Sequence, residues 1–328
     1  MYFTHRPAKK GDLENCFSLL LEKQTYVDKS KVNLLALWAL LIREEACVSV
    51  VLEDRRLPVS ERVVGFGFTY FLADDFLKRA KTHLPPFPVK AMLRKYPGRK
   101  QPYLLKKEIE KACCGKGITL FTPHYGWDQR RLSKEDAFHA RSLLQECFMS
   151  YHAGFKIKEM LMEAHGPQMR DLQATAGMRV RRDYKEFKGS DHWNGLANFN
   201  QPYLMGCTAA EAMKQPGTSM ALLWSKHSPP RFAFSVAEKK MLEKALEGET
   251  DEDISSSLNI STWTVKKRWQ SVYGKVSGLD PDILRQKTLK NAAPTPPTRQ
   301  RRRKLTDYLR DHLEELRSTI PTPGSTKS

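Results

Sequence analysis

The chain has 328 residues, and its 55 lysines and arginines exceed its 37 aspartates and glutamates, which leaves a net charge of +18 and an isoelectric point of about 9.6. Such a surplus favours polyanionic partners, because cationic side chains release the counterions that phosphates hold. Charged and polar residues interrupt Met1–Asp12, and the longest apolar stretch, Leu34–Ile42, is about half of what a bilayer crossing requires. We therefore expect no secretory leader, no membrane partner and a cytoplasmic location.

Hydrophobic patterns in residues 1–188 predict an α+β domain, a mixed sheet with helices. The opening stretch Phe3–Leu20 reads as a strand, a Gly-Asp helix start and an amphipathic helix. The elements expected after it are a helix at Leu34–Arg43, a β-hairpin of Val48–Glu53 and Val63–Phe71, a long helix at Lys134–Tyr151, a strand at Phe155–Ala164, a helix at Pro167–Ala176 and a last strand at Met178–Phe187.

This order resembles the acyltransferase fold of the GNAT superfamily over residues 1–188, with an irregular insertion at Leu72–Lys116. The runs that carry the likeness are Arg6-Pro7-Ala8, Gly11-Asp12-Leu13, Val64-Gly65-Phe66 and Ala176-Gly177-Met178-Arg179-Val180. The family holds the coenzyme A pyrophosphate on backbone amides of a glycine-containing loop at a helix start. Here the stretch Thr122–Phe138 before the long helix contains Gly126 alone.

Because this stretch lacks the glycine-containing loop of the family, we expect a scaffold that has lost acetyl transfer. Tyr151, Tyr184 and Glu163 have the side chains of an acid and a base, but nothing in the sequence sets their geometry, so no catalytic residue is assigned. We expect no cofactor, and a domain that senses a small-molecule or protein effector. An active N-acetyltransferase that binds acetyl-CoA or acyl-CoA and carries a DNA-targeting module is the alternative. A different α/β fold is also open.

Metal and redox patterns are weak throughout the chain. The histidines His124, His139, His152 and His165 are at least 13 residues apart, so they form no i, i+4 ligand pair. The six cysteines contain no C-x-x-C pair. We expect reduced thiols and no metal site, although the adjacent Cys113 and Cys114 leave a redox sensor open.

Residues 189–231 are polar and rich in Gly, Pro and Asn, which predicts a linker region with a short helix near Thr208–Lys214 and a strand at Ser219–Trp224. Residues 232–290 follow a different pattern. Ser235, Thr250 and Ser261 are placed as N-caps of three successive helices, and Gly248 and Asn259 as the stops between them.

The third of these helices has two contrasting faces. Val265, Trp269, Val272 and Val276 follow one another at steps of four, three and four and therefore point inward. The opposite face presents Trp263, Lys266, Lys267, Gln270 and Gly274. Lysine suits phosphates and guanine edges, and glutamine can pair with adenine, so this face predicts contact with DNA. A small solvated bundle whose lysines only confer solubility is the alternative.

The segment Phe234–Val276 resembles the LuxR-type helix-turn-helix domain of bacterial transcription regulators, and it aligns without a gap. The matching features are Glu238, Gly248, the run Ile254, Leu258, Ile260 and Ser261, and the signature Thr264-Val265-Lys266; Asn259 and Arg268 depart from it. The resemblance implies an all-α tetrahelical domain with a fourth helix at Pro281–Lys290 and a homodimer on double-stranded DNA, associated with the nucleoid. The dimer is expected to pair through this helix, to which Leu279, Ile283 and Leu284 give a small apolar face, together with the N-terminal half. It places base reading at Trp263, Lys266, Lys267 and Gln270, and phosphate contacts at Thr262, Thr264, Arg268 and Lys275.

Residues 291–328 complete the chain as a basic, Pro-rich linker, an amphipathic helix at Leu305–Ser318 and a disordered tail. The cations Arg299, Arg301, Arg302, Arg303 and Lys304 are expected to form an extended arm that neutralises phosphates or enters a minor groove. A solubilising tail, or a tether for a helix that docks on RNA polymerase, is the alternative.

Overall fold

The computed structural model describes residues 2–20, 29–84, 86–95, 101–187, 201–225, 230–284 and 298–317. The chain divides into two compact units, which are considered separately. Unit 1 comprises residues 1–149 and 155–227, and unit 2 comprises residues 150–154 and 228–328. No helix in the described ranges is both long and apolar enough to cross a bilayer.

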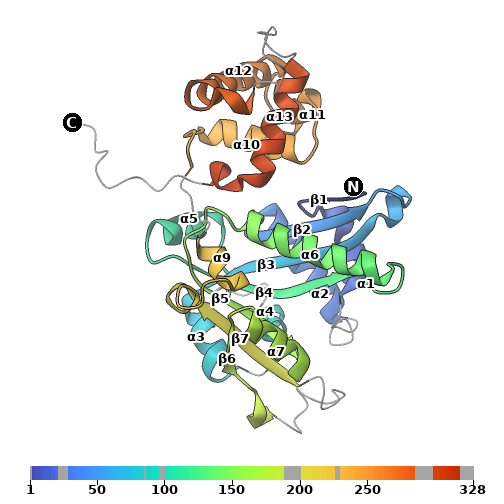
Figure 1. Cartoon of the computed structure of the whole chain (residues 1–328), viewed down its shortest axis with the longest axis vertical. Coiled ribbons are helices and arrows are strands. Elements are labelled where there is room, and N and C mark those ends of the chain that lie inside the picture. The colour runs from blue at the N-terminus through green and yellow to red at the C-terminus, as the bar shows by residue number, and fades with distance from the viewer. Residues whose placement is uncertain are drawn as a thin grey trace, which may run out of the picture. The chain divides into compact units, whose positions relative to one another are not determined.

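Unit 1 is built on a seven-stranded sheet in the order β1-β2-β3-β4-β5-β7-β6 (Figure 1). The strands are β1 (Phe3–Arg6), β2 (Cys47–Asp54), β3 (Val63–Leu72), β4 (Ile118–Trp127), β5 (Ile157–His165), β6 (Arg179–Arg182) and β7 (Pro202–Thr208). Every pairing is antiparallel except β4 with β5, which is parallel and ends at Phe121 and Leu161. The predicted mixed sheet is therefore present.

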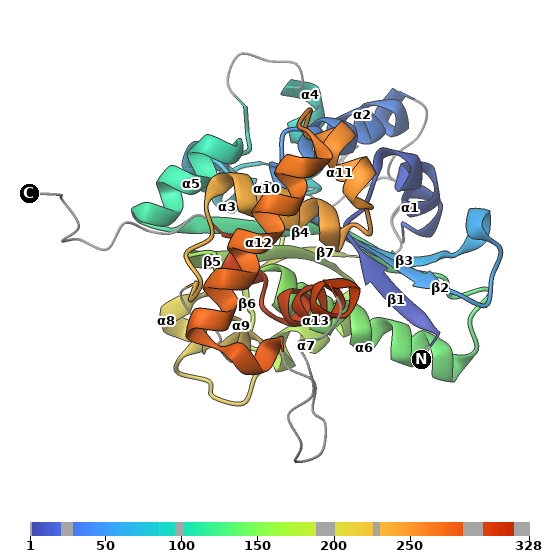
Figure 2. The same cartoon turned by 90° about the horizontal axis from the view of Figure 1, so that it is seen from above.

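Helices cover both faces of this sheet. Helices α1 (Leu13–Leu19) and α2 (Lys29–Arg43) lie on one side and α6 (Lys134–Tyr151) on the other (Figure 2). The remaining helices of unit 1 are α3 (Asp74–Thr82), α4 (Pro88–Lys95), α5 (Lys106–Cys114), α7 (Pro167–Thr175), α8 (Ala209–Ala212) and α9 (Ser219–Ser225). The core on the α2 side is aromatic, with Trp38 stacked on Phe68 at 4.6 Å between ring centroids.

The structure corrects several expectations for unit 1. The insertion at 72–116 is not irregular, since it contains α3, α4 and α5. The last strand stops at Arg182 because Tyr184 adopts a positive φ of 54°, which a strand cannot continue. The expected strand at Ser219–Trp224 is helix α9, in which Met220, Ala221 and Leu223 are buried and Trp224 donates to the Ile157 carbonyl.

The segment expected to be a linker supplies an interior strand of the sheet. Residues Pro202–Thr208 form β7, which lies between β5 and β6 and is buried over almost its whole length. Its sequence, PYLMGCT, is a continuous apolar run, as is typical of a strand covered on both faces. Residues 202–225 therefore belong to unit 1, and the expected boundary at residue 188 lies too early.

Unit 2 contains helices α10 (Val236–Leu246), α11 (Asp251–Ser257), α12 (Thr262–Leu279) and α13 (Thr298–Asp311). Met241 of α10, Ile254 of α11 and Val265 of α12 form one core with Leu305 and Leu309 of α13. The first three helices begin and end close to where the caps predicted. Of the fourth helix expected at Pro281–Lys290, the structure describes a 3-10 turn at Pro281–Ile283, and residues 285–290 lie outside the described ranges.

The expectation of an extended basic arm was wrong. Arg301–Lys304 are helical, as the first turns of α13, and this helix continues to Asp311 before a 3-10 turn at Leu313–Leu316. The amphipathic helix therefore starts seven residues earlier than its expected start at Leu305. The reason is tertiary: the leucines of α13 enter the core of unit 2, and the basic turn ahead of them packs on α11 and α12.

Candidate nucleic-acid interface

Reciprocal caps start the helices that hold α12. The Ser235 hydroxyl accepts a hydrogen bond from the Glu238 amide at 3.3 Å, and the Ser235 amide donates to the Glu238 carboxylate at 2.6 Å. Thr250 and Asp253 form the same capping box on α11. Ser261 caps α12 by accepting from the Thr264 amide at 3.1 Å. Each cap satisfies amides that have no partner inside the helix, so the three helix starts follow from the local sequence.

The connections between these helices use left-handed residues. Gly248 has φ +86° after α10, and Asn259 has φ +51° between α11 and α12. Glycine adopts this conformation without steric cost, and asparagine is among the other residues that visit it. Both turns were predicted from the sequence. Gly248 sets the direction in which α11 leaves α10, and Asn259 sets the direction in which α12 leaves α11.

The inward face of α12 is the predicted one. Val265, Trp269, Val272 and Val276 are buried in the core of unit 2, and Tyr273 joins them. The Trp269 indole donates to the Asp251 carboxylate of α11 at 3.1 Å. This bond ties α12 to α11 and satisfies the single donor of a buried indole.

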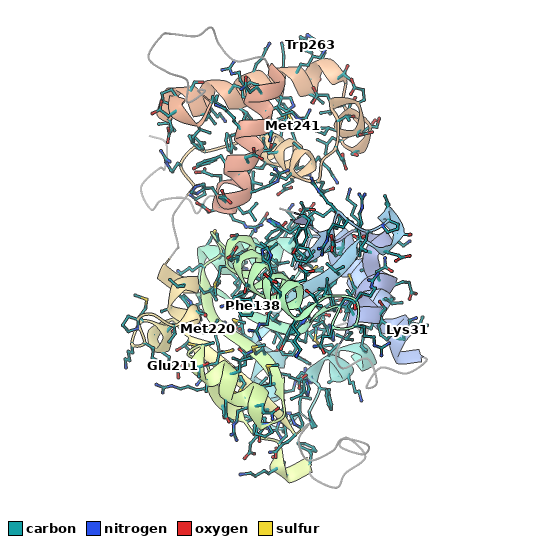
Figure 3. All side chains as sticks on the ribbon, turned by 45° about the vertical axis from the view of Figure 1, so that its right-hand side comes forward. Lys31, Phe138, Glu211, Met220, Met241 and Trp263 are labelled. Carbon is teal, nitrogen blue, oxygen red and sulfur yellow. The ribbon has the colours of Figure 1, made fainter. Side chains whose placement is uncertain are left out.

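The outward face of α12 is also the predicted one. Trp263 is 62% exposed, and Lys266, Lys267, Gln270 and Gly274 are exposed along the same side. Figure 3 shows Trp263 projecting away from the helices, whereas Met241 points in among them. The Lys267 ammonium lies 3.9 Å from the centre of the Trp263 ring. Within the described residues neither lysine has an ion pair, so this face presents two cations and one amide to solvent.

The four residues expected to contact phosphates differ in exposure, and two of them contact α10 instead of facing solvent. Thr262 is exposed, and Thr264 is half-buried with its hydroxyl 2.9 Å from that of Ser261. Arg268 turns toward α10 and donates to the Ala237 carbonyl at 3.3 Å. Lys275 forms an ion pair with the buried Glu238 at 2.6 Å. Arg268 and Lys275 therefore have roles in holding α10 against α12, which the sequence did not indicate.

The basic turn of α13 is engaged inside unit 2. Arg302 pairs with Asp251 at 2.6 Å, donates to the Glu249 carbonyl and covers the Trp269 ring at 4.9 Å. Arg301 lies 4.9 Å from the Tyr273 ring centre. Arg303 is exposed, 3.8 Å from Asp307, Lys304 is half-buried, and the side chain of Arg299 lies outside what the structure describes.

Unit 1 has its own polar cluster at the turn between β4 and α6. The Asp128 carboxylate accepts from the amides of Arg130 at 3.0 Å and Arg131 at 2.9 Å and from the Arg131 guanidinium. Burial raises the pKa of Asp128, but these bonds outweigh burial and hold the pKa below its usual range. Sequence reasoning missed Asp128, but an aspartate two residues before a polar turn is the pattern of an Asx-turn and could have indicated it.

The three acid and base candidates of the sequence lie in two units, Glu163 and Tyr184 in unit 1 and Tyr151 in unit 2. Glu163 on β5 is buried and accepts from the Phe87 amide at 2.7 Å. Tyr184 is fully buried; burial, and next the charge of Glu163, raise its pKa well above 10. Tyr151, at the end of α6, is grouped with unit 2. No cluster of metal-binding side chains occurs among the residues that the structure describes.

Comparisons with known proteins give matches by structure alone. No family model and no curated protein matches the chain. The similar solved structures include the C-terminal condensation domain of Ebony in complex with beta-alanyl-dopamine, at 10% identity over 63% of this chain and 98% of that one, with a TM-score of 0.40. Arabidopsis thaliana NAA60 in complex with acetyl-CoA shares 13% identity over 63% and 99%, with a TM-score of 0.37.

A third similar structure is a mutant form of the spermidine N-acetyltransferase SpeG from Vibrio cholerae, at 12% identity over 66% of this chain and 97% of that one, with a TM-score of 0.36. Identities and TM-scores at this level carry no activity, substrate or partner over to this chain. Its function is therefore argued from its own residues.

Proposed function

We propose that the chain is a sequence-specific DNA-binding transcription regulator that inserts α12 into the major groove of double-stranded DNA. The observation that supports this most is the division of α12 into a buried apolar face and an exposed face with Lys266, Lys267 and Gln270. A helix of this kind, fixed at its start by Ser261 and oriented by α10 and α11, suits the geometry of groove recognition.

Each exposed side chain has a partner on DNA that fits its chemistry. A lysine can donate to the O6 and N7 acceptors of guanine, and the Gln270 amide can pair with both N6 and N7 of adenine. Gly274 adds no side chain and meets no atom within 4 Å where a Cβ would be, so the helix backbone can approach the phosphates there. The net charge of +18 adds the non-specific attraction to polyphosphate.

We further propose a homodimer, because a single small module buries too little DNA surface for tight specificity and a symmetric pair reads two half-sites. The apolar face expected to serve the dimer is partly used inside unit 2, since Leu284 is buried in its core while Leu279 remains 61% exposed. RNA polymerase as a second partner, and a cytoplasmic, nucleoid-associated location, belong to the same proposal.

For unit 1 we propose a regulatory role in sensing a small-molecule or protein effector, without acetyl transfer. The support comes from the turn before α6, where the GNAT resemblance would place the coenzyme A pyrophosphate. The amides of Arg130 and Arg131 already bind the Asp128 carboxylate, and Glu135 and Asp136 occupy the first turn of α6. The turn amides that an incoming anion would need are therefore already used, while Arg131 and Arg56 balance the charges of Asp128 and Asp136.

The DNA proposal is tested by selecting duplexes from a random pool with the full chain and mapping the bound site by footprinting. Lys266→Ala with Lys267→Ala should lower affinity for the selected duplex by about 30-fold or more and blur its base preference, since each good base contact contributes roughly 1–3 kcal/mol. A symmetric footprint over two half-sites is expected for the wild type.

The matched control is Lys240→Ala with Arg310→Ala, which removes the same charge from exposed positions on α10 and α13. It should lower affinity modestly and equally for all duplexes, because only the overall charge changes. Specific footprinting that survives the Lys266 and Lys267 double substitution would contradict the assignment of α12 as the reading helix.

A further inference from the structure

Trp263 stands apart from the other aromatic side chains of unit 2. Phe232, Phe234, Trp269 and Tyr273 are buried in its core, and Trp263 is the one exposed aromatic among the residues described there. Its ring contact is with the Lys267 ammonium, one helical turn further along α12. The indole therefore adds little to the packing of unit 2, although an aromatic of this size offers a large apolar surface.

The position of Trp263 in α12 bears on its role. It is the second residue after the Ser261 cap, on the same exposed side as Lys266, Lys267 and Gln270. In helices that read the major groove, the residues near the N-terminus are those that reach base edges. The Lys267 ammonium over the ring restricts the indole and occupies one region of its surface, which leaves apolar edge and face for another contact.

We propose that Trp263 contacts the 5-methyl group of a thymine in the major groove and thereby makes the chain select thymine at one position of each half-site. This inference rests on the proposed function of α12. The thymine methyl is the apolar group among the major-groove base edges, so it is the natural partner of an apolar ring presented there. Lys267, held against the same ring, is then directed to a neighbouring base or phosphate.

Two other contacts are open to an exposed indole on DNA, and they predict different behaviour. Stacking on a sugar or a phosphate gives affinity without base preference. Insertion between base pairs is typical of side chains that enter from the minor groove and kink the duplex. Neither depends on a methyl group, so removing single methyl groups separates them from the proposed contact.

The test uses the selected duplex, resynthesised with deoxyuridine in place of one thymine at a time, and measures its affinity for the full chain. For the wild type, deoxyuridine should weaken binding about fourfold at one position of each half-site, the effect of one lost methyl contact. Trp263→Ala should bind more weakly and show no difference between thymine and deoxyuridine at that position. Trp263→Phe, which keeps an apolar ring, should retain part of the difference.

Val236→Ala removes another exposed apolar side chain of unit 2 outside α12 and should leave the thymine dependence unchanged. Circular dichroism of each variant separates loss of contact from loss of folding. A wild type that binds its duplex specifically but is indifferent to every deoxyuridine overturns the methyl contact alone. An equal loss by Trp263→Ala on all duplexes also overturns it, in favour of backbone stacking. Absence of any specific duplex would instead overturn the proposed function.

Discussion

Glu238 connects three parts of unit 2 through one buried carboxylate. It accepts from the Ser235 amide at 2.6 Å, from the Ser271 hydroxyl at 2.7 Å and from the Lys275 ammonium at 2.6 Å. The first bond starts α10 and the other two hold it against α12. Burial alone would raise the pKa of Glu238, but these partners outweigh it and lower the pKa to about 2.

The stability of unit 2 should therefore fall in acid through this residue. The pKa of Glu238 is lower in the folded chain than its ordinary value of 4.5, so its contribution is complete above about pH 5 and is lost as the pH falls toward 2. We expect Glu238→Gln to lower the free energy of unfolding by on the order of 2 kcal/mol at pH 7, and by roughly half of that or less at pH 3. Urea unfolding at both pH values measures the difference; an equal loss at pH 7 and pH 3 would speak against an ionised role.

Helix α13 is part of the core of unit 2. Leu305 and Leu309 are fully buried with the residues of α10 and α12, and Leu313 and Leu316 are nearly so. Arg302 adds an ion pair and a ring contact to α11 and α12. Deleting α13 would thus remove part of the core of unit 2 together with its basic residues.

Leu309→Ala should lower the free energy of unfolding of unit 2 by about 2–5 kcal/mol, because it leaves a cavity at a fully buried site. Arg303→Ala on the exposed side of the same helix should change it by less than about 0.5 kcal/mol. Thermal unfolding of the full chain, followed by circular dichroism, compares the two variants. If both leave unfolding unchanged, α13 does not belong to the core.

The turn between β4 and α6 decides whether unit 1 can bind coenzyme A in the way the GNAT resemblance implies. Because Asp128 occupies the turn amides, we expect calorimetry to detect no binding of acetyl-CoA by the full chain at millimolar concentration. The DNA duplex selected above is the positive control for the same sample. Tight binding of acetyl-CoA, followed by acetyl transfer to an added amine, would favour the acetyltransferase alternative.

Much of unit 2 could be predicted because its signals are local. Caps at Ser235, Thr250 and Ser261 act over three residues, and the turns at Gly248 and Asn259 depend on single residues. The spacing of Val265, Trp269 and Val272 determines which side of α12 is buried, and hence which side is exposed. In unit 1, local hydrophobic patterns likewise predicted the hairpin of β2 and β3 and the long helix α6.

The remaining features were decided by residues that are distant in the chain. The sequence predicted a phosphate contact for Lys275, but its ammonium pairs with Glu238. It predicted an extended arm for Arg302, but the guanidinium pairs with Asp251, 51 residues away. The run Pro202–Thr208 forms an interior strand because it pairs with β5 on one side and β6 on the other. Charge and apolar patterns show which side chains require an ion pair, a hydrogen bond or an apolar contact. Only the tertiary structure decides whether that contact is made within the protein or with another molecule.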